Sequence, residues 1–113
     1  MIFAWYWAHE HICALYEPHP LWGFLGRCAG HGGFPYLRLR LPGSRPEATQ
    51  FIRVASKALI PAADVLDGPN PYVTGSETAY GPHGFLSLEF DGPKLVERVH
   101  SAEGNVLREQ VLA

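Results

Sequence analysis

The chain is poor in the residues that define several classes of protein. Cys13 and Cys28 are its only cysteines, too few for a disulfide framework, so a reducing compartment is expected. No stretch approaches the roughly 20 apolar residues of a membrane helix, and Ile2 to Ala8 is too short for a signal-peptide core. Lys and Arg form no long run, and the formal net charge of −2 argues against a nucleic-acid surface. We therefore expect a cytoplasmic protein with neither a nucleic-acid nor a membrane partner.

Two common catalytic signatures are also missing. The four glycines between Gly26 and Gly33 are not followed by the Lys-Ser/Thr of a Walker loop, and no serine sits in a nucleophile-elbow sequence. The length of 113 residues fits one small domain or part of a larger one. Apolar residues make up 47% of the chain, which indicates a folded rather than a disordered protein.

The best chemical signal is a pair of histidines that follows an aromatic run, in Trp5-Tyr6-Trp7-Ala8-His9-Glu10-His11. On a strand, side chains two residues apart point to the same face, so His9 and His11 would lie together. Neutral imidazole is a common ligand for zinc, manganese, iron and nickel. The pair predicts a metal site, although two polar residues at a strand end, with no metal, fit the same spacing.

Three segments together resemble a known family. Ala8-His9-Glu10-His11 is similar to the Gly-His-x-His motif that closes the active site of calcineurin-like metallophosphoesterases. The glycine-rich segment Gly26 to Pro35 resembles one found downstream in some members, and Gly84 to Gly92 with the strand after it looks like their C-terminal hairpins. The resemblance covers residues 1 to about 36 well and 80 to 113 loosely.

This resemblance implies the C-terminal fragment of a hydrolase that cleaves phosphate esters at a centre of two divalent ions, Mn, Fe or Zn. His9 and His11 would each bind one ion, and His31, Gly32 and Gly33 would lie in the second shell or near the substrate. The motif glycine is replaced by Ala8, and the family's Asp-x-His, Gly-Asp and Gly-Asn-His motifs do not occur. We therefore expect the chain alone to be inactive, and expect that another chain supplies the missing N-terminal half.

The residue pattern predicts a mostly-β fold with antiparallel strands, one partial domain over residues 1–113. Met1 to Ala8 is almost continuously apolar, as in a strand buried on both faces, and Ile12 to Glu17 follows as a second strand. Phe34 to Leu41 alternates, which predicts Leu37 and Leu39 on the buried face and Arg38 and Arg40 in solvent.

The remainder of the chain predicts one helix, one long loop and a meander. Ser44-x-x-Glu47 reads as a capping box before apolar residues at helical spacing, so a short helix is expected over 45–60, with a strand from Gln50 to Val54 as the competing interpretation. Residues 61–82 are expected to be a long loop. Strands are expected over 84–90, 94–100 and 106–112, the first two joined by a turn at Asp91-Gly92.

Two other functions remain open from the residues alone. The chain could be a small stand-alone β-domain that binds a protein, with its aromatic first strand pairing to the edge of a partner's sheet. A mononuclear zinc site formed by His9, His11, Cys13 and Cys28 is the third possibility, and it predicts tetrahedral coordination by thiolate and imidazole.

Overall fold

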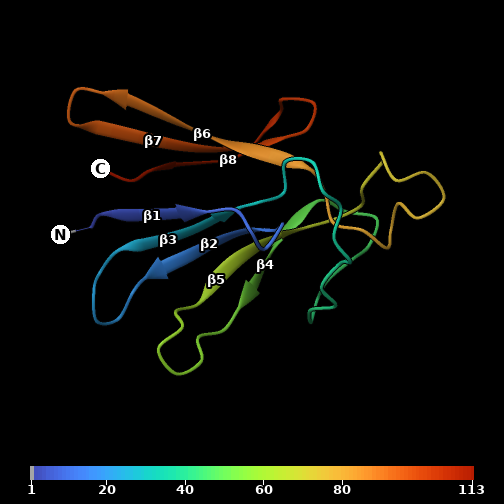
Figure 1. Ribbon diagram of the computed structural model, residues 1–113, viewed down its shortest axis with the longest axis horizontal. Coiled ribbons are helices and arrows are strands. Elements are labelled where there is room, and N and C mark those ends of the chain that lie inside the picture. Colours follow the sequence, from blue (N-terminus) through green and yellow to red (C-terminus); the bar gives the residue numbers. More distant parts are fainter. Residues whose placement is uncertain (1) are drawn as a thin grey trace.

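The fold of the computed structural model, which describes residues 2–113, is a sandwich of two β-sheets (Figure 1). The first sheet has the strand order β1-β3-β2-β5-β4. These strands are β1 Ala4–Trp7, β2 Cys13–Pro18, β3 Leu25–Ala29, β4 Gln50–Val54 and β5 Ala63–Asp67. Only the β1–β3 pair is parallel, and the other pairs are antiparallel.

The second sheet is the predicted C-terminal meander, and the structure confirms it. Its strands are β6 Gly84–Asp91, β7 Lys94–Ser101 and β8 Val106–Val111, paired in that order. A two-residue loop joins β6 to β7, with Gly92 at a φ of 57°. That left-handed backbone favours glycine, which explains why Asp-Gly marked this turn correctly.

The core between the sheets is small. Cys13, Leu15 and Leu66 of the first sheet pack against Val99 of β7, and three half-buried side chains surround them: Phe51, Leu86 and Leu107. A second apolar cluster lies on the opposite face of the first sheet, where Trp7 and Tyr16 pack over small residues such as Ala14 and Cys28. The first sheet is therefore apolar on both faces.

The mostly-β class is confirmed, but the helix predicted over 45–60 is wrong. Residues 2–113 contain no helix, and β4 instead occupies Gln50–Val54, the competing interpretation. β4 pairs with all five residues of β5, and its neighbours Phe51 and Ile52 pack on opposite faces of the sheet. The Ser44 hydroxyl does not cap a helix, because it donates a hydrogen bond to Asp67.

Three further predictions need correction. The loop expected over 61–82 contains β5, an interior strand, and only its second part, from residue 68, is a connection. Phe34 to Leu41 is not a strand and makes one isolated bridge, between Leu37 and Tyr80. The first strand is shorter than expected and lies at the edge of its sheet, with Trp5 54% exposed, so it is not buried on both faces.

Candidate functional site

His9 and His11 lie in a tight turn at the carboxyl end of β1. The strand stops at Trp7, and the turn closes when the His11 amide donates to the Ala8 carbonyl at 3.3 Å. The Trp7 indole N–H also donates to the Glu10 carboxylate at 2.7 Å, which fixes the turn on the end of the strand. The alternation of a strand therefore does not apply to the two histidines. Their positions are determined by the turn.

The turn nevertheless brings the two imidazoles together. Their ring centres are 6.0 Å apart, and the His11 ring lies 5.2 Å from that of Phe34. His11 has a φ of 59°, an uncommon conformation for a residue other than glycine. A metal held by an imidazole nitrogen lies about 3 Å from the ring centre, so this spacing suits one ion or two adjacent ions.

The glycine-rich segment packs directly against this turn. Gly30 follows the last residue of β3, and its amide donates to the Ile12 carbonyl at 2.9 Å. A Cβ atom at Gly30 would lie 1.9 Å from the Ala8 oxygen and 2.8 Å from the His11 nitrogen. Only glycine fits there, so the close approach of the two segments explains the residue. Gly32 and Gly33 are exposed beyond it.

His31 lies below the same segment, at the junction of the two sheets. It is 1% exposed, and neither ring nitrogen has a hydrogen-bond partner among the residues that the structure describes. Burial, with a smaller effect from nearby His83, lowers the pKa of His31 to about 4. The His31 carbonyl accepts a 3.0 Å hydrogen bond from the Gly84 amide at the start of β6. His31 thus joins the glycine-rich segment to the second sheet.

The two cysteines do not join the histidines. Cys13 belongs to the core between the sheets and Cys28 to the cluster on the outer face, so one metal ion cannot bind both. Burial raises the pKa of the Cys13 thiol to about 12, which keeps it protonated. Over residues 2–113, no three His, Cys, Asp or Glu side chains gather closely enough to hold a metal ion.

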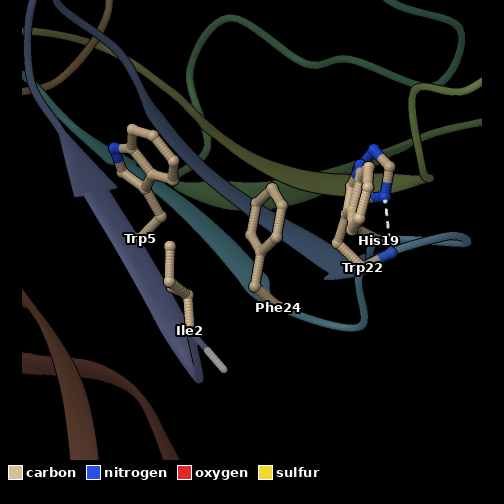
Figure 2. A pocket seen from close by; sticks show the side chains of 5 residues that line it. All are labelled: Ile2, Trp5, His19, Trp22 and Phe24. Atoms are coloured by element: carbon tan, nitrogen blue, oxygen red, sulfur yellow. Dashed lines mark hydrogen bonds between the residues drawn. The ribbon is translucent and has the colours of Figure 1, made fainter.

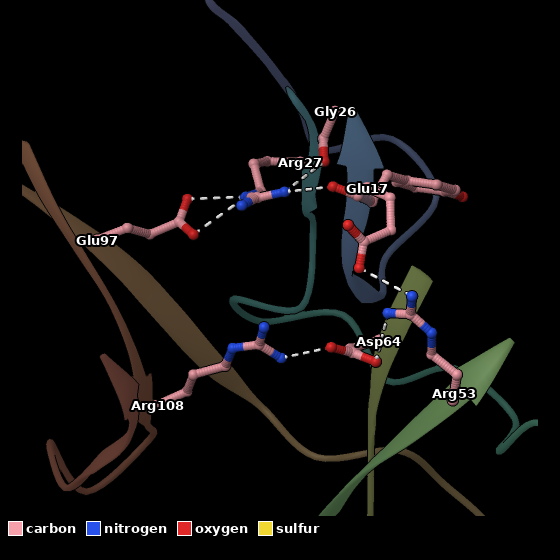
Figure 3. A network of polar contacts seen from close by, with 8 residues as sticks. Glu17, Gly26, Arg27, Arg53, Asp64, Glu97 and Arg108 are labelled. Atoms are coloured by element: carbon pink, nitrogen blue, oxygen red, sulfur yellow. Dashed lines mark hydrogen bonds and ion pairs between the residues drawn. The ribbon is translucent and has the colours of Figure 1, made fainter. Parts of the chain in front are cut away.

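A network of charged side chains, which no sequence pattern predicted, connects the two sheets (Figure 3). Arg27 of β3 donates to the Glu97 carboxylate of β7 at 3.0 Å, and the exposed fractions of the two side chains are 2% and 1%. The Tyr6 hydroxyl donates to the same carboxylate. Arg108 of β8 pairs with Asp64 of β5 at 2.7 Å. Both pairs hold one sheet against the other.

A second buried ion pair lies beside the long connection that follows β5. Arg38 donates to both carboxylate oxygens of Asp67, at 2.8 and 2.6 Å, and to the Ser44 hydroxyl. Burial alone would raise the pKa of Asp67, but hydrogen bonds from Arg38 and Ser44 outweigh it and lower the pKa. Arg38 is therefore structural, whereas Arg40 is exposed. The prediction that both arginines lie in solvent is wrong for Arg38.

An apolar groove of about 600 Å³ lies on the outer face of the first sheet, beside β1 (Figure 2). In Figure 2 the Phe24 ring stands between Trp5 and the pair formed by Trp22 and His19. The His19 ring stacks on Phe24 with a centre distance of 5.1 Å, and its Nδ1 accepts hydrogen bonds from two backbone amides of the β2–β3 loop. The fifth lining residue is Ile2.

Comparison with known proteins adds no relative from which a function could be transferred. No family model, curated protein or solved structure matches the chain. Residues 2–113 also form no helix with the length and apolar character needed to cross a membrane. A functional proposal therefore depends on the arrangement of the chain's own residues.

Proposed function

We propose that the chain is the C-terminal portion of a calcineurin-like, metal-dependent phosphoesterase and contributes half of its metal site. One observation carries this proposal. The two segments that resemble the family, the histidine turn and the glycine-rich segment, follow the carboxyl ends of the neighbouring parallel strands β1 and β3 and pack against each other. Loops at the carboxyl ends of adjacent parallel strands are a common place for binding sites in α/β sheets.

His9 and His11 are the proposed metal ligands. His9 is exposed and His11 is half-buried, so an ion could reach both. In a complete site, two divalent ions would activate a water molecule and neutralise the phosphoryl oxygens. The backbone of Gly32 and Gly33 lies open to a substrate, and buried His31 is proposed to position the segment from beneath. Its carbonyl, anchored to Gly84, fixes where that segment runs.

The proposed half-site still requires carboxylate ligands. A centre of two ions normally includes carboxylates, and Glu10, the acidic residue between the histidines, is hydrogen-bonded to the Trp7 indole. We propose that another chain, or another part of a longer one, supplies them. The chain alone is then expected to bind a metal ion but to show no metal-dependent hydrolysis of an aryl phosphate.

Isothermal titration calorimetry with Zn²⁺ and with Mn²⁺ tests the half-site directly. Wild-type protein and a His9→Ala/His11→Ala variant are titrated under the same conditions. We expect binding by the wild type and its loss in the double variant, because the two imidazoles are the proposed ligands. His19→Ala is the matched control, since it also removes an imidazole but lies in the apolar groove.

Two results would contradict the proposal. Equal binding by the wild type and the double variant would place the metal ion elsewhere, and no binding by either would leave the histidines as a structural pair. Circular dichroism of each variant shows whether the fold is retained. Rapid turnover of the aryl phosphate by the chain alone would refute the expectation that carboxylates must come from elsewhere.

A further inference from the structure

β1 is an unprotected edge strand. Among residues 2–113, the edge strands are β1 and β4 of the first sheet and β6 and β8 of the second. Three of them carry charged side chains, which discourage pairing with another chain: Arg53 in β4, Glu89 and Asp91 in β6, and Arg108 and Glu109 in β8. β1 has the sequence Ala-Trp-Tyr-Trp and carries none.

The free edge of β1 has a defined hydrogen-bonding pattern. The Phe3 carbonyl accepts from the Leu25 amide at 3.0 Å, so the peptide groups of Phe3 and, two residues on, Trp5 face β3. Amide and carbonyl groups alternate along a strand, so those of Ala4 and Tyr6 point away from the sheet. These outward groups are spaced to form an antiparallel ladder with another strand.

We propose that a second copy of this chain pairs with that edge, antiparallel and about a two-fold axis at Trp5. In this register Ala4 stands opposite the partner's Tyr6, so the outward groups of both strands exchange hydrogen bonds. Trp5 stands opposite the partner's Trp5, and Phe3 opposite the partner's Trp7, on the outer face of the sheet. Aromatic pairs of this kind stabilise antiparallel strands.

The absence of charge favours a second copy as the occupant, and the exposed area indicates how tightly it would bind. Ile2 to Ala8 contains no charged residue, so the two strands bring no like charges together. Phe3 and Trp5 are 49% and 54% exposed, and Ile2 is 53% exposed. Since a fully buried aromatic side chain covers about 150–250 Å², these three residues offer on the order of 300 Å² per copy before the backbone is counted. A standard interface buries about 800 Å² per partner, so the expected dimer is a weak one.

The pairing closes on itself and lies apart from the metal half-site. An isologous contact uses the free edge of β1 in both copies, so the assembly stops at two. His9 and His11 follow the end of β1 and lie outside the paired stretch from Ile2 to Ala8. The dimer is therefore a separate proposal from the phosphoesterase function, and an experiment can contradict one of them without contradicting the other.

A charge-swap experiment tests the register. Sedimentation equilibrium is measured at about 1–100 μM, the range in which small interfaces associate, for the wild type, Trp5→Lys, Trp5→Glu and an equal mixture of the two variants. We expect a dimer for the wild type and at least about tenfold weaker association for each variant, because each places like charges opposite one another. The mixture should regain the dimer, since Lys then faces Glu.

Two further variants separate the β1 edge from other surfaces. Phe90→Lys introduces the same charge at a residue of β6 that is 73% exposed, and it should leave the dimer intact. Ala4→Pro removes an outward amide without removing a donor from the β1–β3 pairing, and it should weaken the dimer. Circular dichroism confirms that each variant is folded.

Each alternative result would overturn the proposal. A wild type that stays monomeric over the whole concentration range would show that no second copy binds to the edge of β1. A dimer that persists in Trp5→Lys must form through another surface. Association that continues beyond two copies contradicts closed pairing, and a mixture that stays monomeric contradicts the register at Trp5.

Discussion

The Arg27 guanidinium and the Glu97 carboxylate meet between the two sheets at 3.0 Å, although 70 residues separate them in the chain. Arg27 also donates to the Tyr16 carbonyl at 2.7 Å, so its charge is held from two strands. Burial, together with the hydrogen bond to Glu97, raises the pKa of Tyr6 above its usual range and keeps its hydroxyl as a donor. The Arg27–Glu97 pair holds β3 against β7, and β1 is held in turn by its pairing with β3.

Glu97→Gln should strongly destabilise the fold. The substitution leaves the Arg27 charge buried without a counterion, which typically costs about 3–5 kcal/mol. Urea unfolding at neutral pH measures the free energy of unfolding. Glu89→Gln is the matched control, because Glu89 pairs with Arg98 but its side chain is 60% exposed, and such pairs contribute about 0–1 kcal/mol. Similar small losses in both variants would show that the buried pair does not hold the sheets together.

Arg38→Gln and Arg40→Gln should differ although the residues are two apart. Arg38→Gln leaves Asp67 buried without its counterion and should cost about 3 kcal/mol, whereas Arg40→Gln should change the free energy of unfolding by less than about 0.5 kcal/mol. Urea unfolding of both variants at pH 7 is the measurement.

The pH dependence of the Arg38 variant has a definite sign. Because the pKa of Asp67 is lowered in the folded protein, its stabilisation is present above the usual carboxyl range and is lost as the pH falls through the lowered pKa. The difference between wild type and Arg38→Gln should therefore shrink in acid. A difference that stays constant down to strongly acid pH would contradict this assignment.

Neither of these two buried ion pairs could be predicted from the sequence. Alternation in Phe34 to Leu41 predicted buried leucines and solvated arginines, yet Leu37 is 69% exposed and Arg38 is held by Asp67. From the sequence, an arginine is expected at the surface unless its counterion is known. The counterion of Arg38 is Asp67, which lies 29 residues further along the chain. Hydrophobic periodicity alone carries no information about such a pair.

The strands that were predicted correctly are those that local pattern determines. The β6–β8 meander has alternating side chains and a glycine at the turn, and both signals act within a few residues. Gln50 to Val54 is different, because Phe51 and Val54 fit a helix as well as a strand. Its five-residue pairing with β5 decided the outcome. β5 was itself hidden by two aspartates: Asp64 pairs with arginines of β4 and β8, and Asp67 pairs with Arg38.

The candidate site was predicted in part. The histidine pair and the glycine-rich segment were identified separately, and the structure brings them together. Their contact at Gly30 depends on the parallel pairing of β1 with β3, which no local signal indicated. The residue pattern favoured a first strand buried on both faces, because a continuous apolar run is typical of one. An edge strand that pairs with a partner's sheet was only the alternative interpretation.

Gly30→Ala should destabilise the protein and weaken metal binding, whereas Gly33→Ala should do neither. A Cβ at Gly30 would overlap the Ala8 oxygen, so the histidine turn must shift, at an expected cost of about 3 kcal/mol. A Cβ at Gly33 meets nothing within 4 Å. Thermal unfolding and zinc calorimetry of both variants provide the comparison. If Gly30→Ala kept wild-type stability, the two segments would not be in contact in solution.

His31 should make the fold sensitive to mild acid. Its pKa falls from 6.5 to about 4 on folding, so the unfolded chain binds the proton more tightly. The stabilisation is therefore complete above pH 6.5 and is lost as the pH falls towards 4. A shift of this size corresponds to about 3 kcal/mol for the one group.

Urea unfolding at several pH values between 7.5 and 4.5 separates His31 from the carboxylates. Acidic groups titrate in the wild type and in His31→Leu alike, so the difference between their slopes isolates the imidazole. We expect the wild type to lose stability faster in acid, by up to about 1.4 kcal/mol per pH unit for one proton. An NMR titration should show the His31 ring still neutral at pH 5. A ring that titrates near 6.5, or equal slopes for the two proteins, would mean that His31 is hydrated and not buried at the junction of the sheets.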